Sequence, residues 1–404
     1  MRYLRKTLWG VGAIILLQVL KKLFDGVFPE ATIFYHNLLS CTQVVVLLWL
    51  VIAIIAEWMN PGKKMQGKYL LFPFLILAVP EMLFTYWLHY PSRIPSFLTP
   101  TFRNYYGGTQ RNIIQFDPRC SVYDSSLLYT LKPSSRFVFA NYEFADSFYT
   151  NKMGLRDDEN SLVRPEIICL GDSYAMGWGV GQDKTFPELI SSISGKKVLN
   201  AAISSYGTAR ELKNLYRLDT SALQYIIIQY GRNDATENEQ FVRHNYSLKL
   251  SPGETYYTSV NMHYWNKQWF PGKHFITMAK MYAGKTMQGF FKNKKSSATD
   301  SYTVRLHQSA MHFTDMLLRS SVDFKKTRVF VADINEKELM DNHFLDEVNT
   351  LAGQSPYKEH FNNNLVMVPV ADTLTPDDYY ILDDHLRPSG HQKIAARLIN
   401  YMFH

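Results

Sequence analysis

The chain has 404 residues, of which 46% are hydrophobic and 20% charged, so a disordered protein is excluded and at least one full core is expected. Its formal net charge is +7, but residues 1–100 carry +5 of it and residues 101–404 only +2. The larger part also has no basic stripe and no zinc-finger or RNP-type motif. We therefore expect no nucleic-acid partner.

Three cysteines are too few for a disulfide framework and allow at most one bridge. Cys41 lies in an apolar segment, and Cys169 lies in a run that predicts a buried strand. A packed free thiol at Cys169 is therefore favoured over a bridge to Cys120. The sequence contains no Cys-x-x-Cys, no His-Glu-x-x-His and no phosphate-binding P-loop. We expect no metal and no organic cofactor.

Three apolar segments at the beginning of the chain predict a transmembrane region over residues 1–95, with helices at about 7–24, 37–58 and 69–90. Residues 39–58 are apolar for about the 20 residues that a bilayer core requires. The third segment ends in aromatic residues typical of a membrane interface, and it contains Glu81. A carboxyl group that contacts neighbouring helices is the favoured interpretation of Glu81 over an ion path.

The orientation depends on the first apolar segment, Leu8 to Leu20, which fits a short span or a signal-peptide-like core. If all three segments cross, the basic residues before the first and after the second lie in the cytoplasm under the positive-inside rule. Everything after residue 90 is then outside. If the first segment does not cross, the large domain faces the cytoplasm. We expect a multi-pass membrane protein with an extracytoplasmic, periplasmic domain.

Residues 96–165 lack a sustained period and are interpreted as a linker and collar, whereas residues 166–404 alternate strands and helices. The expected strands are 166–170, 198–203, 225–230, 328–334 and 365–370, and the expected helices are 185–194, 208–218, 302–324 and 389–402. An insertion is expected at about 235–301. This alternation predicts an α/β fold with a three-layer, flavodoxin-like parallel sheet, whose ligands gather beyond the carboxyl ends of the strands.

Three short motifs follow predicted strands or precede the last helix. They are Gly171-Asp172-Ser173-Tyr174, Gly231-Arg232-Asn233-Asp234 and Asp383-Asp384-His385. Taken singly they fit a helix cap, a turn and a solvated loop. Taken together they provide a nucleophile, an amide donor for an oxyanion, and a histidine base oriented by a carboxylate. These are the groups that serine ester hydrolysis requires.

Residues 149–400 resemble the SGNH/GDSL hydrolase family, in particular a membrane-anchored bacterial branch. The similar blocks are Gly171-Asp172-Ser173, Gly231-Arg232-Asn233-Asp234, Asp383 with His385, the Pro388-Ser389-Gly390-His391 helix start and the lead-in Thr150 to Arg156. The resemblance implies Ser173 as nucleophile and His385 as base. It also implies that the backbone N–H groups of Ser173 and Ser205 and the Asn233 side chain form the oxyanion hole.

Two positions depart from the family pattern. Ser205 stands where the family usually has Gly, and its N–H can still donate if the backbone conformation permits. The family usually spaces the acid and base as Asp-x-x-His, but residue 382 is Leu. In an extended stretch residues i and i+2 point to one side, so Asp383 is expected to orient His385 and Asp384 to face solvent or a cap.

We therefore expect a membrane-anchored serine esterase that removes O-acetyl or other short acyl groups from a cell-surface glycan, or hydrolyses another small ester. One alternative is an O-acyltransferase that works on a polysaccharide with a partner membrane acyltransferase. A second alternative is a non-catalytic glycan-binding protein that keeps the fold. The simultaneous presence of Ser173, Asn233, Asp383 and His385 argues against the second alternative.

Overall fold

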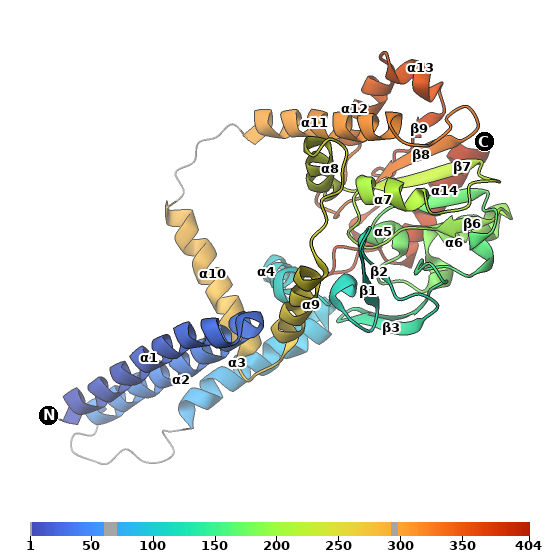
Figure 1. Ribbon diagram of the computed structural model, residues 1–404. Coiled ribbons are helices and arrows are strands. Elements are labelled where there is room, and N and C mark those ends of the chain that lie inside the picture. The colour runs from blue at the N-terminus through green and yellow to red at the C-terminus, as the bar shows by residue number, and fades with distance from the viewer. Residues whose placement is uncertain (1, 60–70, 292–297) are drawn as a thin grey trace. The chain divides into compact units, whose positions relative to one another are not determined.

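The computed structural model describes residues 2–59, 71–291 and 298–404 (Figure 1). The chain forms two compact units. Residues 1–112 and 257–293 make up the first, here called the N-terminal unit, and residues 113–256 and 294–404 make up the second, here called the α/β unit. The chain therefore passes from one unit to the other three times.

Three helices of the N-terminal unit are long and apolar enough to cross a membrane, over Thr7–Val27, Pro29–Met59 and Phe72–His89. They correspond to the three expected segments, except that residues 69 and 70 lie outside the described part. Many of their apolar side chains are exposed, for example Trp9 at 71% and Trp58 at 78%. An apolar surface of this extent is typical of a membrane contact. The helices of this unit are α1 (Arg2–Val27), α2 (Thr32–Met59), α3 (Phe72–His89), α4 (Thr99–Tyr105) and α10 (Lys273–Phe291), with most of α9 (Gly253–Lys267).

Glu81 of α3 contacts the start of α10 within this unit. Its carboxylate accepts hydrogen bonds from the backbone N–H groups of His274 at 3.2 Å and Phe275 at 2.9 Å. A negative charge at a helix N-terminus is stabilising, because the first N–H groups have no partner in the helix. This contact agrees with the favoured interpretation of Glu81 as a residue that binds a neighbouring helix.

The α/β unit begins with two antiparallel hairpins and continues with a parallel sheet. The hairpin strands are β1 (Ser121–Asp124) with β2 (Leu128–Leu131), and β3 (Arg136–Asn141) with β4 (Phe144–Tyr149). The sheet consists of β5 (Ile167–Leu170), β6 (Val198–Asn200), β7 (Tyr225–Tyr230), β8 (Arg328–Asp333) and β9 (Leu365–Met367). Its order is β6-β5-β7-β8-β9 with every pair parallel, which confirms the expected α/β fold with a parallel sheet. This is the flavodoxin-like strand order.

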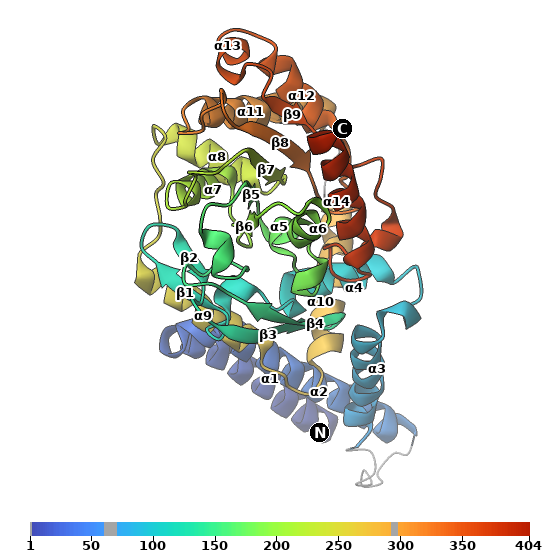
Figure 2. The ribbon, with the colours of Figure 1, turned by 90° about the vertical axis from the view of Figure 1, so that its right-hand side faces the viewer.

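Helices cover both faces of the sheet (Figures 1 and 2). On one face Ile167, Ile227 and Phe330 share a buried cluster with residues of α6 and α14. On the other face Tyr230 stacks on Phe344 of α12 at a ring distance of 3.7 Å. Because consecutive strand residues point to opposite faces, strands buried on both sides need continuous apolar runs. The helices are α5 (Ser173–Met176), α6 (Phe186–Ser194), α7 (Thr208–Leu215), α8 (Asp234–Arg243), α11 (Ala298–Leu318), α12 (His343–Ala352), α13 (Tyr357–Phe361) and α14 (Pro388–Phe403).

Most expected elements of residues 166–404 occur with ends shifted by a few residues. The largest difference is at α11, which ends at Leu318, six residues earlier than expected, while β6 stops at Asn200 and β9 at Met367, each three residues earlier than expected. The backbone of Ala201 to Ile203 and of Val368 leaves the regular ladder although these side chains are buried, so an apolar run overestimates strand length. Cys41, Cys120 and Cys169 are buried free thiols.

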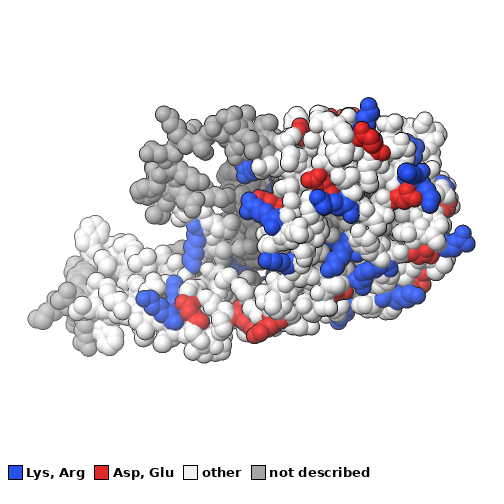
Figure 3. Space-filling view, turned by 45° about the horizontal axis from the view of Figure 1, so that its top comes forward, with Lys and Arg blue, Asp and Glu red and all other residues white. Residues whose placement is uncertain are grey.

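Segment 257–293, part of the expected insertion at 235–301, packs in the N-terminal unit. Trp265 lies against Phe34 of α2 at a ring distance of 5.6 Å, and Phe270 lies against the same ring at 5.7 Å. The aromatic residues of this segment therefore contribute to helix packing in that unit. In the view of Figure 3, acidic and basic residues are interspersed over the α/β unit.

Candidate active site

Ser173 is the third residue after β5 and the first residue of the one-turn helix α5. Asp172 caps this helix by accepting the N–H of Tyr174 at 2.9 Å. Gly171 lies close to the next strand, and a Cβ atom there would come within 2.7 Å of Gln229. Gly177 ends the helix in the left-handed conformation with φ of 87°. The turn therefore projects the Ser173 hydroxyl beyond the carboxyl end of the sheet, where it is expected.

The structure brings Ser173, His385 and Asp383 into one hydrogen-bonded chain. His385 Nε2 lies 2.7 Å from Ser173 Oγ, and His385 Nδ1 lies 2.5 Å from Asp383 Oδ1. All three side chains are buried. The distances suit transfer of the serine proton to the imidazole while the carboxylate holds the other ring nitrogen protonated.

Asp384 also contacts the imidazole, with its Oδ1 3.0 Å from His385 Nδ1. Its side chain is 21% exposed, whereas that of Asp383 is fully buried. The expectation that Asp384 faces only solvent or a cap therefore differs from its position, because the loop turns both carboxylates toward the ring. Burial lowers the pKa of His385, but the charges of Asp383 and Asp384 outweigh it and raise the pKa to about 9.

Two aromatic rings fix the plane of the imidazole. Trp178 stacks on His385 with ring centres 4.7 Å apart and an angle of 16°. Its indole Nε1–H donates to Asp383 Oδ2 at 3.2 Å, so one side chain contacts both His385 and Asp383. Tyr174 lies against the imidazole at 4.9 Å, and its hydroxyl donates to the Asp384 carbonyl.

Asn233 follows β7 and precedes α8, so it lies at the same end of the sheet as Ser173. Its Nδ2 donates one hydrogen bond to Asp172 Oδ2 at 2.9 Å. An amide nitrogen carries two hydrogens, so the second remains for an oxyanion. Asp172 thus links the nucleophile turn to the candidate amide donor.

Ser205 adopts a left-handed backbone conformation with φ of 60°. This conformation costs a non-glycine residue about 1–2 kcal/mol, which explains why glycine is common at this position in the family that the sequence resembles. Two contacts hold it: Arg210 Nη2 donates to the Ser205 carbonyl at 2.5 Å, and Gln115 Nε2 donates to Ser205 Oγ at 3.0 Å. Within the described chain, the Ser205 N–H donates to no protein group, so it is available for an oxyanion.

Glu143, in the turn between β3 and β4, holds the loop that carries Asp383. Its carboxylate accepts the backbone N–H groups of Ile381, Leu382 and Asp383 at 2.7–2.8 Å. Burial raises the pKa of the Glu143 carboxyl above its ordinary value, although the three N–H groups favour the charged form. Leu382, the residue that replaces the usual acid of the family spacing, is therefore part of an anion-binding turn.

Arg156 supports the turn after Ser173 from inside the core. Its guanidinium donates to the carbonyls of Met176, Gly177 and Val180, and it lies 3.6 Å from the centre of the Phe148 ring. Burial lowers the pKa of Arg156 to about 9. Its place in the lead-in block is the sequence signal that points to this role.

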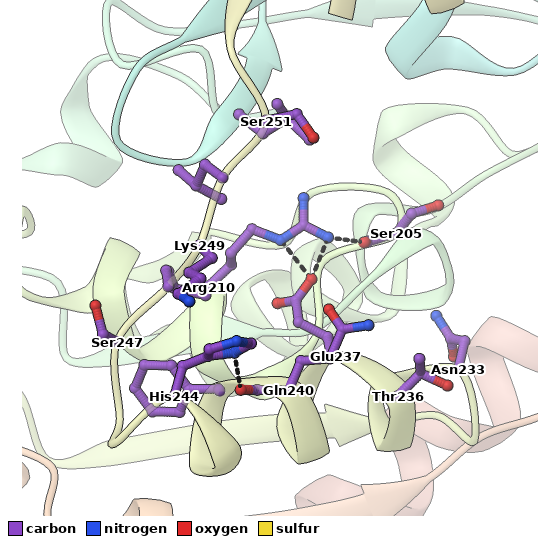
Figure 4. Close-up of a pocket in the computed structure, with 14 residues that line it drawn as sticks. Ser205, Arg210, Asn233, Thr236, Glu237, Gln240, His244, Ser247, Lys249 and Ser251 are labelled. Atoms are coloured by element: carbon purple, nitrogen blue, oxygen red, sulfur yellow. Dashed lines mark hydrogen bonds and ion pairs between the residues drawn. The ribbon is translucent and has the colours of Figure 1, made fainter. Parts of the chain in front are cut away.

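A cavity of about 370 Å³ opens beside Ser205 and Asn233 (Figure 4). Arg210 crosses it to pair with Glu237 of α8, and Glu237 also accepts the N–H of Gly207. The same ion pair therefore lines the cavity and supports the Ser205 turn. The lining also includes Leu128, Thr236, Gln240, Phe241, His244 and residues 247–251.

Sequence reasoning missed Glu143, Gln115 and the Arg210–Glu237 pair. None belongs to a local motif, and each acts on a residue that is between 5 and 240 positions away in the chain. Trp178 carried a signal, since it stands between Gly177 and Gly179 just after the nucleophile.

No family model matches the chain, and no curated protein matches it. Among solved structures, the chain is similar to one assigned to the G-D-S-L family of lipolytic proteins from Desulfitobacterium hafniense DCB-2. The TM-score is 0.30 at 11% identity, over 58% of this chain and 98% of that chain. It is also similar to TesA, with a TM-score of 0.31 at 12% identity, over 59% of this chain and 97% of that chain. At this similarity, function has to be inferred from the side chains of the site.

The pKa of His385 predicts the pH dependence of any reaction that uses it as a base. Only the neutral imidazole accepts a proton, so kcat/KM should rise about tenfold per pH unit and level off near pH 9. Asp384→Asn removes one of the two charges that raise this pKa, so the plateau should begin at lower pH. Superimposable pH profiles of the variant and the wild type would contradict this.

Glu143→Gln should misplace Asp383, because a carboxamide has one acceptor oxygen in place of two. We expect kcat/KM to fall about tenfold, with a plateau that starts at lower pH as one carboxylate moves away from His385. Ser147→Ala, at an exposed position of the same hairpin, serves as the matched control. A loss of thermal stability with an unshifted pH profile would mean that Glu143 only stabilises the fold.

Proposed function

We propose that the chain is a membrane-anchored serine ester hydrolase with an SGNH-like catalytic domain. The observation that carries the proposal is the buried chain of contacts from Ser173 Oγ through His385 to Asp383. If Ser173 served only to start a helix, neither His385 nor Asp383 would be needed beside it. Their combination with two candidate oxyanion donors after neighbouring strands matches the requirements of acyl transfer.

In the proposed mechanism, His385 Nε2 takes the proton of Ser173 Oγ as the oxygen attacks the ester carbonyl. The carbonyl oxygen becomes an oxyanion that accepts hydrogen bonds from the backbone N–H groups of Ser173 and Ser205 and from Asn233 Nδ2. Each such donor contributes on the order of 3 kcal/mol in other enzymes. The imidazolium that forms has both Asp383 and Asp384 at its Nδ1, and their charges stabilise it.

The ester C–O bond then breaks, and the leaving alcohol takes the proton from His385. Water attacks the acyl-serine, with His385 again accepting a proton, and the carboxylic acid leaves as Ser173 regains its hydrogen. The contacts of the imidazole with Trp178 and Tyr174 would keep its plane fixed through both half-reactions. Asp383 keeps the Nδ1 tautomer that the cycle needs.

The proposed substrate is an O-acetyl or other short acyl ester on a cell-surface glycan. The polar lining of the cavity beside Ser205 and Asn233 supports a substrate rich in hydroxyl groups. The apolar surfaces of α1, α2 and α3 support membrane anchoring, which would hold the site close to an envelope polymer.

Hydrolysis of p-nitrophenyl esters, from acetate to long acyl chains, by the full-length protein in detergent micelles tests the proposal. Turnover should prefer acetate and should fall by several orders of magnitude in Ser173→Ala. Ser192→Ala, at an exposed position of α6, is the matched serine control. Equal and negligible rates in folded wild type and Ser173→Ala would exclude simple hydrolysis and favour transfer with a partner protein or binding without catalysis.

The proposed orientation places the α/β unit outside the cytoplasm, with all three apolar helices crossing the membrane. Alkaline phosphatase fusions after residues 30 and 95 should then be active, and a fusion after residue 65 inactive. This orientation is expected because the basic residues before the first span and after the second favour the cytoplasmic side of the membrane. An inactive fusion after residue 95, with the protein expressed normally, would contradict the extracytoplasmic placement.

A further inference from the structure

A polar stripe begins at Asn233, one of the proposed oxyanion donors, and follows one side of α8. Asn233, Glu237, Gln240 and His244 are spaced four, three and four residues apart, and all line the cavity of Figure 4. This spacing places side chains on one helix face. At about 1.5 Å per residue the stripe extends roughly 16 Å from the catalytic end, which exceeds the length of one sugar ring.

The chain that follows α8 forms the opposite wall of this cavity. Ser247, Lys249 and Ser251 are exposed, whereas the leucines between them are half-buried. The hydroxyl and ammonium groups of this wall therefore remain accessible, while Leu248 and Leu250 anchor it. The cavity thus has hydrogen-bonding groups on both sides.

A second cavity, of about 450 Å³, adjoins the first, since Phe241, Ser247 and Leu248 line both. Tyr216 and Tyr246 contribute aromatic rings to it, and Tyr216 is 60% exposed. The guanidinium of Arg319 lies 4.1 Å from the centre of the Tyr246 ring. Tyr246 is half-buried and covered by Arg319, so the exposed ring of Tyr216 is the one that suits the C–H face of a sugar.

We propose that the two cavities form one extended binding site for an oligosaccharide chain, with the acylated sugar at the Ser205 and Asn233 end and further sugars toward Tyr216. The placement of the acylated end rests on the proposed esterase function. An acyl chain would fit the first cavity poorly, because it would remove water from Arg210, Glu237 and Gln240 without replacing the hydrogen bonds. A chain of hydroxyl-bearing rings can replace them along the whole stripe.

Binding tests this site independently of catalysis. Unacylated gluco-, xylo-, manno- and chito-oligosaccharides, from mono- to pentasaccharide, are titrated calorimetrically into the full-length Ser173→Ala protein in detergent. At least one series should bind about tenfold more tightly as pentasaccharide than as disaccharide, because added sugars reach the second cavity. Affinity that is undetectable or independent of length in all four series would overturn the proposal.

Two variants locate the site. Gln240→Leu should weaken binding of every oligosaccharide in the responding series about tenfold, and Tyr216→Ala should flatten the dependence on length. Glu239→Gln is the matched control, since Glu239 pairs with Arg243 on α8 and does not line the cavity. Unchanged binding in both folded variants would place the oligosaccharide elsewhere and overturn the proposal.

Hydrolysis separates this proposal from the esterase function. For acetylated members of the responding series, kcat/KM per acetyl group should rise about tenfold from disaccharide to pentasaccharide. The value for p-nitrophenyl acetate serves as the reference for the intrinsic esterase activity. Acetate could instead be released at a rate independent of sugar length, while longer p-nitrophenyl acyl esters are cleaved faster. This result would overturn the extended binding site but would retain the proposed esterase function. Length-dependent binding without any ester hydrolysis would support the site and remove the esterase function.

Discussion

In the proposed mechanism, the main physical constraint on the α/β unit is a buried imidazole that has to gain and lose a proton. Burial alone would keep His385 neutral, and the proposed reaction requires a cation there for part of each cycle. Two carboxylates and the Trp178 ring meet this demand, and the remaining features of the site keep these groups in place. The consequence is an imidazole whose pKa, raised to about 9, favours the protonated form at neutral pH.

The side chains that hold the Asp383 loop and the Ser173 turn come from outside the parallel sheet. Glu143 contacts the loop of Asp383 from a hairpin that precedes the first strand of the sheet. Arg156 contacts the turn after Ser173 from the segment between that hairpin and the first sheet strand. Both are charged groups that satisfy backbone atoms at positions where regular secondary structure ends. The residues before the sheet are therefore integral to the site and do more than connect two parts of the chain.

Much of this could be predicted from the sequence because the relevant signals are local. The apolar runs of β5, β7 and β8 and the polar residues immediately after two of them place Ser173 and Asn233 at one sheet edge. The order of the motifs also indicates His385 with Asp383. Asp384 was harder to predict, since alternation in an extended chain points neighbours apart, and the loop bound to Glu143 is not extended.

The remaining features depend on contacts between distant segments, which periodicity does not encode. The left-handed Ser205 needs Arg210, Gln115 and Glu237 together, and no spacing rule links them. The packing of Trp265 on Phe34 likewise joins residues more than two hundred positions apart. The sequence marks residues 235–301 only as an insertion, and the packing of its segment 257–293 in the N-terminal unit follows from such distant contacts.

The three passages of the chain between the two units have a consequence for biosynthesis. When a ribosome has completed β7, the helices α1, α2 and α3 still lack α10, and the sheet still lacks β8 and β9. The N-terminal unit is completed only after residues 113–256 of the α/β unit have been synthesised, and the α/β unit only after residues 257–293 of the N-terminal unit. The folding of the two units therefore overlaps in time. In a shortened chain that begins after α3, Trp265 and Phe270 would lack Phe34, and the first turn of α10 would lack Glu81. The apolar surface exposed in this way would be a target for chaperones and proteases.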